Sequence, residues 1–171
     1  SSPEQFDFFT GGGIDITFAE AKQTVQDFRA KNPRISRLWK QLDREFKRSA
    51  GGDYHIELPS DRELRYLSVA KNPRGYYTAA TERGGRKRKL YGGLLTENLV
   101  QATARDVFAE HLREIHRAQI GQIVFHVHDE VIVEIPKSLA QEACEQIRQI
   151  MSVTPGWLSG CPIAADAAIH Q

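Results

Sequence analysis

Residues 123–136 read IVFHVHDEVIVEIP, and this stretch decides the fold class of the chain. Two runs rich in β-branched residues flank Asp129 and Glu130, a pattern typical of antiparallel strands joined by a two-residue turn. Such turns favour Asn-Gly or Asp-Gly because the backbone adopts positive φ there, so Glu130 is a poor choice for the second turn position. A departure from local turn preference within an otherwise consistent strand pair indicates a functional constraint.

The two carboxylates at this predicted tip point to a divalent cation. Neighbouring like charges repel one another, and a cation relieves that repulsion. Hard oxygen ligands favour magnesium, which binds through one or two carboxylates together with substrate phosphates and serves phosphoryl or nucleotidyl transfer. His126 and His128, two residues apart, are expected on one sheet face. Two histidines are too few ligands for zinc, so we expect half-buried rings bonded to the backbone.

The segments around this hairpin predict a mixed α/β fold of the α+β type, with an antiparallel sheet and packed helices. A capping box at Thr17 and Glu20 begins a helix that ends before Pro33, and a second helix runs from Pro33 to Gly51-Gly52. Alternating residues predict an antiparallel meander over 53–81. A long helix over 96–117, an amphipathic helix from about 139 to 150 and a short strand within 162–169 complete the prediction. We expect three segments: a helical segment 1–52, a meander and basic loop 53–89, and the hairpin-bearing segment 90–171.

Composition excludes several classes of protein. The 171 residues are 40% hydrophobic and 26% charged, with a formal net charge of +1, which argues against disorder. No apolar run is long enough to cross a membrane, and the N-terminus carries no secretory pattern, so we expect a cytoplasmic protein without a membrane partner. The two cysteines, Cys144 and Cys161, are expected as reduced core thiols.

Charge is concentrated in one loop. Five cations fall within seven residues, namely Arg83, Arg86, Lys87, Arg88 and Lys89. A solvated basic loop and a phosphate-binding loop both fit this pattern.

The string VHDEV at 127–131 resembles motif C, the third polymerase motif of family A DNA polymerases. TENLVQATARD at 96–106 resembles the helix that precedes motif C, most closely in bacteriophage members. LYGG at 90–93 and PGW at 155–157 are also similar to phage sequences, and residues 14–39 resemble the stretch after the fingers helix. The resemblance covers about residues 14–168 and implies part of a polymerase palm together with helices that follow the fingers.

Two further motifs of that family are missing from these residues. Motif A would supply the first metal-binding aspartate, and motif B would supply a lysine and an aromatic residue that hold the incoming nucleotide. DYHIEL at 53–58 is similar to motif A but is one residue short and lies in the wrong place in the chain order. We therefore expect it to be a strand that enters the meander.

The resemblance implies a role for each candidate residue. Asp129 would be the shared ligand of two Mg²⁺ ions, Glu130 a secondary carboxylate and metal ligand, and His128 a contact to the primer-terminal phosphate or sugar. Gln101 would contact the nascent base pair in the minor groove, where shape is read rather than sequence. The loop residues Arg86, Lys87, Arg88 and Lys89 would bind the template–primer backbone.

The resemblance also implies the partners: primer–template DNA, a deoxynucleoside triphosphate, and a chain or segment that holds motifs A and B. The expected location is the cytoplasm of a bacterial host. Alone, the chain is expected to be inactive. The alternatives are a non-catalytic nucleic-acid-binding or assembly module that keeps the palm fold, and a small metal-dependent nuclease.

Overall fold

The computed structural model describes residues 16–170 and confirms the mixed α+β class, with helices packed on antiparallel strands. The principal elements in chain order are α1 (Phe18–Lys31), α2 (Pro33–Arg48), β1 (Tyr54–Glu57), β2 (Glu63–Lys71), β3 (Tyr77–Ala80), β4 (Arg88–Lys89), α3 (Gly92–Ala118), β5 (Gln122–Val127), β6 (Glu130–Glu134) and α4 (Ala140–Met151). Two short 3₁₀ turns, Lys137–Leu139 and Gly156–Leu158, flank α4. No helix within residues 16–170 is long and apolar enough to cross a membrane.

The first two helices begin where the sequence predicts. The Thr17 N–H donates to Glu20 Oε2 at 2.8 Å, and the Glu20 N–H donates to Thr17 Oγ1 at 3.3 Å, which completes the capping box at the start of α1. Pro33 occupies the first turn of α2, where its missing N–H costs no helical hydrogen bond. One face of α2 buries Leu42 and Phe46 against the sheet.

The predicted meander is confirmed and gains a short fourth strand, in the order β1-β2-β3-β4. Its pairs are antiparallel, with Tyr54 opposite Tyr66 between β1 and β2. The rings of Phe46, Tyr54 and Tyr66 contact one another with centroids 5.7–6.2 Å apart. Burial raises the pKa of both tyrosines, and a hydrogen bond from Tyr54 to Glu45 adds to the shift at Tyr54. These rings form the centre of one core.

Helix α3 begins at Gly92, four residues before the predicted start at Thr96. Two successive glycines are weak helix formers, but Gly92 lies so close to α2 that a Cβ atom there would overlap the Trp39 carbonyl oxygen. The Gly92 N–H donates to Asp43 Oδ1 at 3.2 Å. Packing against α2 therefore extends the helix into two glycines whose own helix propensity is low.

The second half of α3 carries a separate two-stranded hairpin, β5-β6, and α4. The His111 imidazole is hydrogen-bonded through Nε2 to the Val153 carbonyl at 2.8 Å, and the Trp157 Nε1–H donates to Glu110 at 2.8 Å. The strand predicted within 162–169 is wrong: this segment has no strand partner among the described residues. The Ala165 N–H bonds instead to the Ser152 hydroxyl at 3.1 Å. Both cysteines are free as expected, but Cys161 is exposed rather than in a core.

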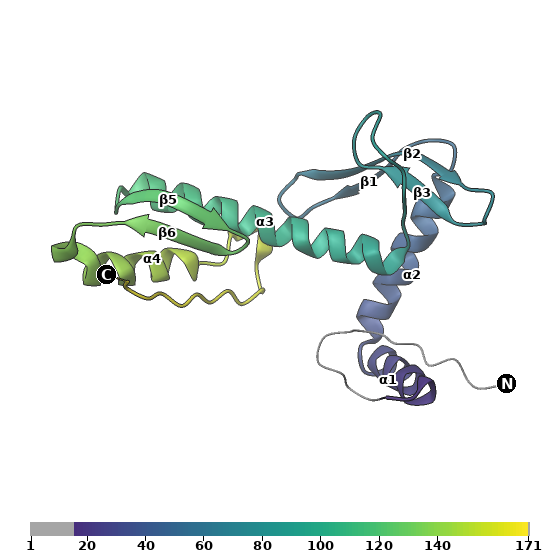
Figure 1. Ribbon diagram of the computed structural model, residues 1–171, viewed down its shortest axis with the longest axis horizontal. Coiled ribbons are helices and arrows are strands. Elements are labelled where there is room, and N and C mark those ends of the chain that lie inside the picture. The colour runs from purple at the N-terminus through teal and green to yellow at the C-terminus, as the bar shows by residue number, and fades with distance from the viewer. Residues whose placement is uncertain (1–15, 171) are drawn as a thin grey trace.

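Figure 1 shows two bodies joined by α3. We call α2, β1–β4 and the first half of α3 the sheet lobe, and the second half of α3 with β5, β6 and α4 the hairpin lobe. Helix α1 lies beyond the far end of α2. The division of the chain into segments at residues 52 and 89 stays a prediction.

Candidate functional site

The hairpin tip is displaced by one residue from its predicted position. Val127 pairs with Glu130, so the two turn residues are His128 and Asp129, and Glu130 is the first residue of β6. The positive φ of 52° falls on His128, at the turn position that glycine often takes. The prediction that Glu130 breaks turn preference is therefore wrong, and the residue that departs from it is His128.

This register also separates the two histidines. His128 lies in the turn, whereas His126 remains in β5 opposite Val131. The His126 ring meets the Phe108 ring of α3 edge to face, with centroids 5.9 Å apart. The expectation that both histidines share one strand face is therefore wrong, because only His126 belongs to a strand.

Asp129 and Glu130 form an exposed acidic tip. Adjacent carboxylates are the right donors for magnesium, but within residues 16–170 no group of three or more His, Cys, Asp or Glu side chains could hold a metal ion. Two carboxylates fit part of a magnesium site, because Mg²⁺ commonly completes its shell with water and substrate phosphates. The tip can thus contribute ligands to a metal but does not enclose one.

Gln101 lies on the stripe of α3 that leads toward the tip. Gln101 and Phe108 are seven residues apart and so occupy one face of the helix, and Phe108 contacts His126 on β5. Strand β5 runs back along α3, so the β5–β6 turn lies beside the middle of the helix (Figure 1). Gln101 therefore lies about two helical turns before the residue of α3 that contacts β5.

A cavity of about 510 Å³ lies beside Gln101 on the sheet-lobe side. The Asn98 side-chain amide donates to the Tyr66 hydroxyl at 3.0 Å within it. Its lining residues are Glu63, Leu64, Arg65, Tyr66, Thr81, Asn98 and Gln101. Gln101 thus borders an open space rather than the core.

The basic loop projects from the sheet lobe, at the top of Figure 1. Arg86, Lys87, Arg88 and Lys89 are all exposed. Lys87 Nζ donates to the Ser68 carbonyl at 2.7 Å, and Lys89 Nζ lies 3.8 Å from the centroid of the Tyr76 ring. The two lysines therefore attach the loop to the sheet, and the two arginines project their charge to solvent.

The motif A-like stretch is a strand, as expected, since Tyr54–Glu57 forms β1. Asp53 accepts a hydrogen bond from the Ser68 N–H at 2.7 Å. Ser68 has a positive φ of 54° within an irregular part of β2. Asp53 thus stabilises a bulge of the sheet.

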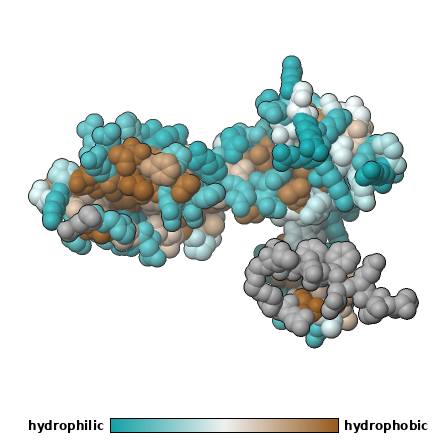
Figure 2. Space-filling view, in the orientation of Figure 1, coloured by the Kyte–Doolittle hydropathy of each residue, from teal (hydrophilic) through white to brown (hydrophobic). Residues whose placement is uncertain are grey.

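The outer face of the hairpin is apolar and uncovered. Four of its side chains are 43–58% exposed: Val124, Phe125, Val127 and Ile132. Figure 2 shows the corresponding hydrophobic patch over β5 and β6. We call these four residues the hairpin face. The nearly continuous apolar runs on both sides of the tip are a sequence signal for this face, because such runs are typical of strands buried on both faces.

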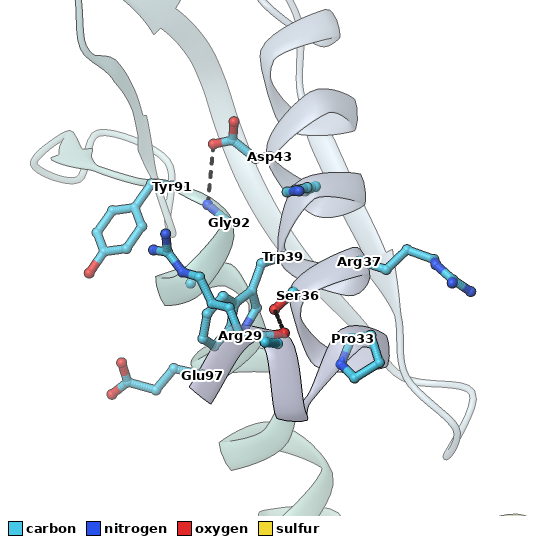
Figure 3. Close-up of a pocket in the computed structure, with 12 residues that line it drawn as sticks. Arg29, Pro33, Ser36, Arg37, Trp39, Asp43, Tyr91, Gly92 and Glu97 are labelled. Carbon is cyan, nitrogen blue, oxygen red and sulfur yellow. Dashed lines mark hydrogen bonds between the residues drawn. The ribbon is translucent and has the colours of Figure 1, made fainter. Parts of the chain in front are cut away.

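A second, larger cleft lies between α1, α2 and the start of α3 (Figure 3). Trp39 and Tyr91 line it together with Arg29. Sequence reasoning missed these residues because they come from three separate elements and form no local motif.

Comparison with known proteins relates the chain to a phage DNA polymerase. No protein-family model matches the chain, and no solved structure matches it. The chain is 29% identical over 185 residues to the DNA polymerase of Bacillus phage SP02, an alignment that covers 92% of this chain. The chain is a distant homologue of part of that polymerase. It spans only 28% of the length of the polymerase.

Proposed function

We propose that this chain forms the C-terminal palm portion of a DNA-directed DNA polymerase of family A. The single observation that carries the proposal is the similarity to a phage DNA polymerase along 92% of the chain. The exposed hairpin tip supports it, because the Asp129 and Glu130 carboxylates lie at the end of a paired strand hairpin and not in a core.

The roles follow from position. Asp129 lies in the turn and Glu130 at the start of β6, so both carboxylates can reach a metal ion held between the tip and a substrate. Magnesium bound there would lower the pKa of the primer 3′-hydroxyl and neutralise the triphosphate and the departing pyrophosphate. His128, beside Asp129 in the same turn, would contact the primer terminus.

Gln101 and the basic loop would hold the DNA. Gln101 borders an open cavity, where its amide can donate to the minor-groove acceptors that all correct base pairs share. Arg86 and Arg88 project to solvent and would contact backbone phosphates without regard to sequence.

The proposal requires a further polypeptide segment with motifs A and B. The hairpin face supports this requirement, because an apolar sheet surface of this kind is normally covered in a finished domain. Both outer edges of the β5-β6 sheet are also unpaired in the described residues, and a two-stranded sheet is only marginally stable by itself. The missing segment would pack here and bring its aspartate close to Asp129.

A primer-extension assay tests the proposal. The 171-residue chain alone should not extend a primer. Combined with a polypeptide that carries motifs A and B, it should do so in magnesium, and Asp129→Asn should reduce the rate at least about a hundredfold, because the metal contributes several kcal/mol to the transition state.

Glu134→Gln is the matched control, since Glu134 is an exposed carboxylate at the other end of β6. It should leave the rate unchanged. The catalytic role would be contradicted if the assembled complex binds primer–template and extends the primer at the same rate before and after Asp129→Asn. A complex that binds DNA without any extension would favour the non-catalytic module.

The basic loop provides a second prediction. Arg86→Ala with Arg88→Ala should weaken primer–template binding in the assembled complex and lower the slope of log affinity against log salt by about one unit per lost contact. Lys87→Ala with Lys89→Ala is the matched pair and should have the smaller effect, because Ser68 and Tyr76 already engage these lysines. Unchanged affinity and slope in both pairs would show that the loop faces away from the DNA.

A further inference from the structure

The cleft in Figure 3 lies at the opposite end of α3 from the hairpin lobe. Its volume of about 1000 Å³ is at the upper end of the range for small-ligand pockets. The C-terminal end of α1, the first half of α2 and the start of α3 form its walls. The cleft is therefore separate from the proposed catalytic tip and needs its own explanation.

Two aromatic side chains offer stacking surfaces in this cleft. Trp39 is half-buried, and Phe28 covers one side of its indole with ring centroids 6.0 Å apart and planes 16° from parallel. This support holds the indole in place while it lines the cleft. Tyr91 is 54% exposed and precedes α3, and in Figure 3 its ring extends away from α2.

The charge of the cleft favours an anion. Arg29, Arg37 and Lys40 line it and form no ion pair among residues 16–170. Figure 3 shows the Arg29 guanidinium beside Trp39 on the side of Tyr91, whereas Arg37 points away.

Two carboxylates also line the cleft, Asp43 and Glu97. Asp43 is already engaged by Lys47 and by the Gly92 N–H. Glu97 is exposed, and its negative charge would repel an anion.

We propose that this cleft binds single-stranded DNA, with bases stacked on Trp39 and on Tyr91 and a backbone phosphate at Arg29. Aromatic platforms combined with cations are the usual means of binding single strands without sequence preference. Duplex DNA does not offer this contact, because its bases are stacked on one another. The inference goes beyond the proposed function, since it requires neither Asp129 nor a metal.

Fluorescence of Trp39 tests the proposal directly. The chain has two tryptophans, and Trp157 lies in the hairpin lobe with its indole bonded to Glu110. In a Trp157→Phe chain, Trp39 is the sole reporter. Titration with a short oligothymidylate should quench its emission with a saturable curve, because a stacked base quenches indole fluorescence.

Variants of the lining residues separate stacking from general charge. Tyr91→Ala and Arg29→Ala should each weaken binding at least about fivefold, as expected for loss of one base stack or one phosphate contact. Tyr91→Phe should retain binding. Glu97→Gln should tighten it. Arg34→Ala is the matched control, since Arg34 lies on α2 but does not line the cleft. Circular dichroism of each variant verifies that it is folded.

Other ligands distinguish the possible sources of the same chemistry. Thymidine monophosphate and an abasic oligonucleotide should each bind at least about fivefold more weakly than the oligothymidylate, and a blunt duplex should not quench Trp39. Absence of quenching by the oligothymidylate would overturn the proposal. So would equal affinity for the duplex or the mononucleotide, or equal affinity in folded Tyr91→Ala, Arg29→Ala and Arg34→Ala chains.

Discussion

Phe46 and Phe125 are the same residue type in opposite surroundings. Phe46 lies in the sheet lobe with no exposed surface, in contact with the rings of Tyr54 and Tyr66. Phe125 lies on the hairpin face and is 58% exposed. The sheet lobe closes its apolar surface within the described residues, whereas the hairpin lobe covers only one face of its sheet.

The difference separates two uses of apolar residues. In the sheet lobe they stabilise the fold of the chain itself, since α2 and the start of α3 together complete the core around the meander. In the hairpin lobe α3 and α4 hold the strand pair from one side, and the other face stays open. An open apolar face beside a pair of carboxylates is what we expect where a catalytic site is assembled from two pieces of polypeptide.

Substituting these two phenylalanines tests the contrast most strongly. Phe46→Ala should lower the free energy of unfolding by about 3–5 kcal/mol, because it removes a fully buried ring and leaves a cavity. Phe125→Ala should change it by less than about 0.5 kcal/mol, as is usual for exposed positions. Urea denaturation followed by circular dichroism measures both. Equal losses would mean that the hairpin face is buried in the free chain.

Acid should produce a smaller effect, and Glu145 is the residue of the hairpin lobe through which it acts. Hydrogen bonds from Arg148, and then from Gln149, lower the pKa of Glu145 on α4 to about 2. A carboxyl group with a lowered pKa adds stability above its unfolded value of 4.5, and this contribution is lost as the pH falls toward about 2. Glu145→Gln should therefore lower Tm slightly at pH 7.

The pH dependence of the Tm difference between Glu145→Gln and the unmodified chain distinguishes an effect of charge from an effect of packing. The Tm gap between Glu145→Gln and the unmodified chain should shrink steadily below pH 4.5. Glu142→Gln on the same helix is the control and should cause a smaller change at every pH. A gap that stays constant between pH 7 and pH 3 would show that Glu145 acts through helix packing rather than through its charge.

Much of the fold follows from local sequence. The capping box of Thr17 and Glu20, Pro33 in the first turn of α2 and the alternating residues of β1 each depend on neighbours in the chain, and each was predicted correctly. The start of α3 was not, because Gly92 packs closely against Trp39 and bonds to Asp43, residues far away in the sequence.

The same limit applies to the candidate site. The pattern around Asp129 indicates a hairpin, but β-branched runs on both sides allow a turn at 128–129 or at 129–130. In the structure the turn lies at 128–129, and the His126 ring packs against Phe108 on α3. The cleft of Trp39 and Tyr91 carries no sequence signal, because its walls come from three helices that meet only in the folded chain.

Hydrogen exchange of the hairpin tests the central claim most directly, namely that the hairpin lobe is completed by another part of a polymerase. Amides of β5 and β6 should exchange faster than those of β2 in the free chain, since only the sheet lobe is closed. When the polypeptide with motifs A and B is added, exchange in β5 and β6 should slow markedly while β2 changes little. A complex that extends primers without any added protection of β5 and β6 would contradict the account.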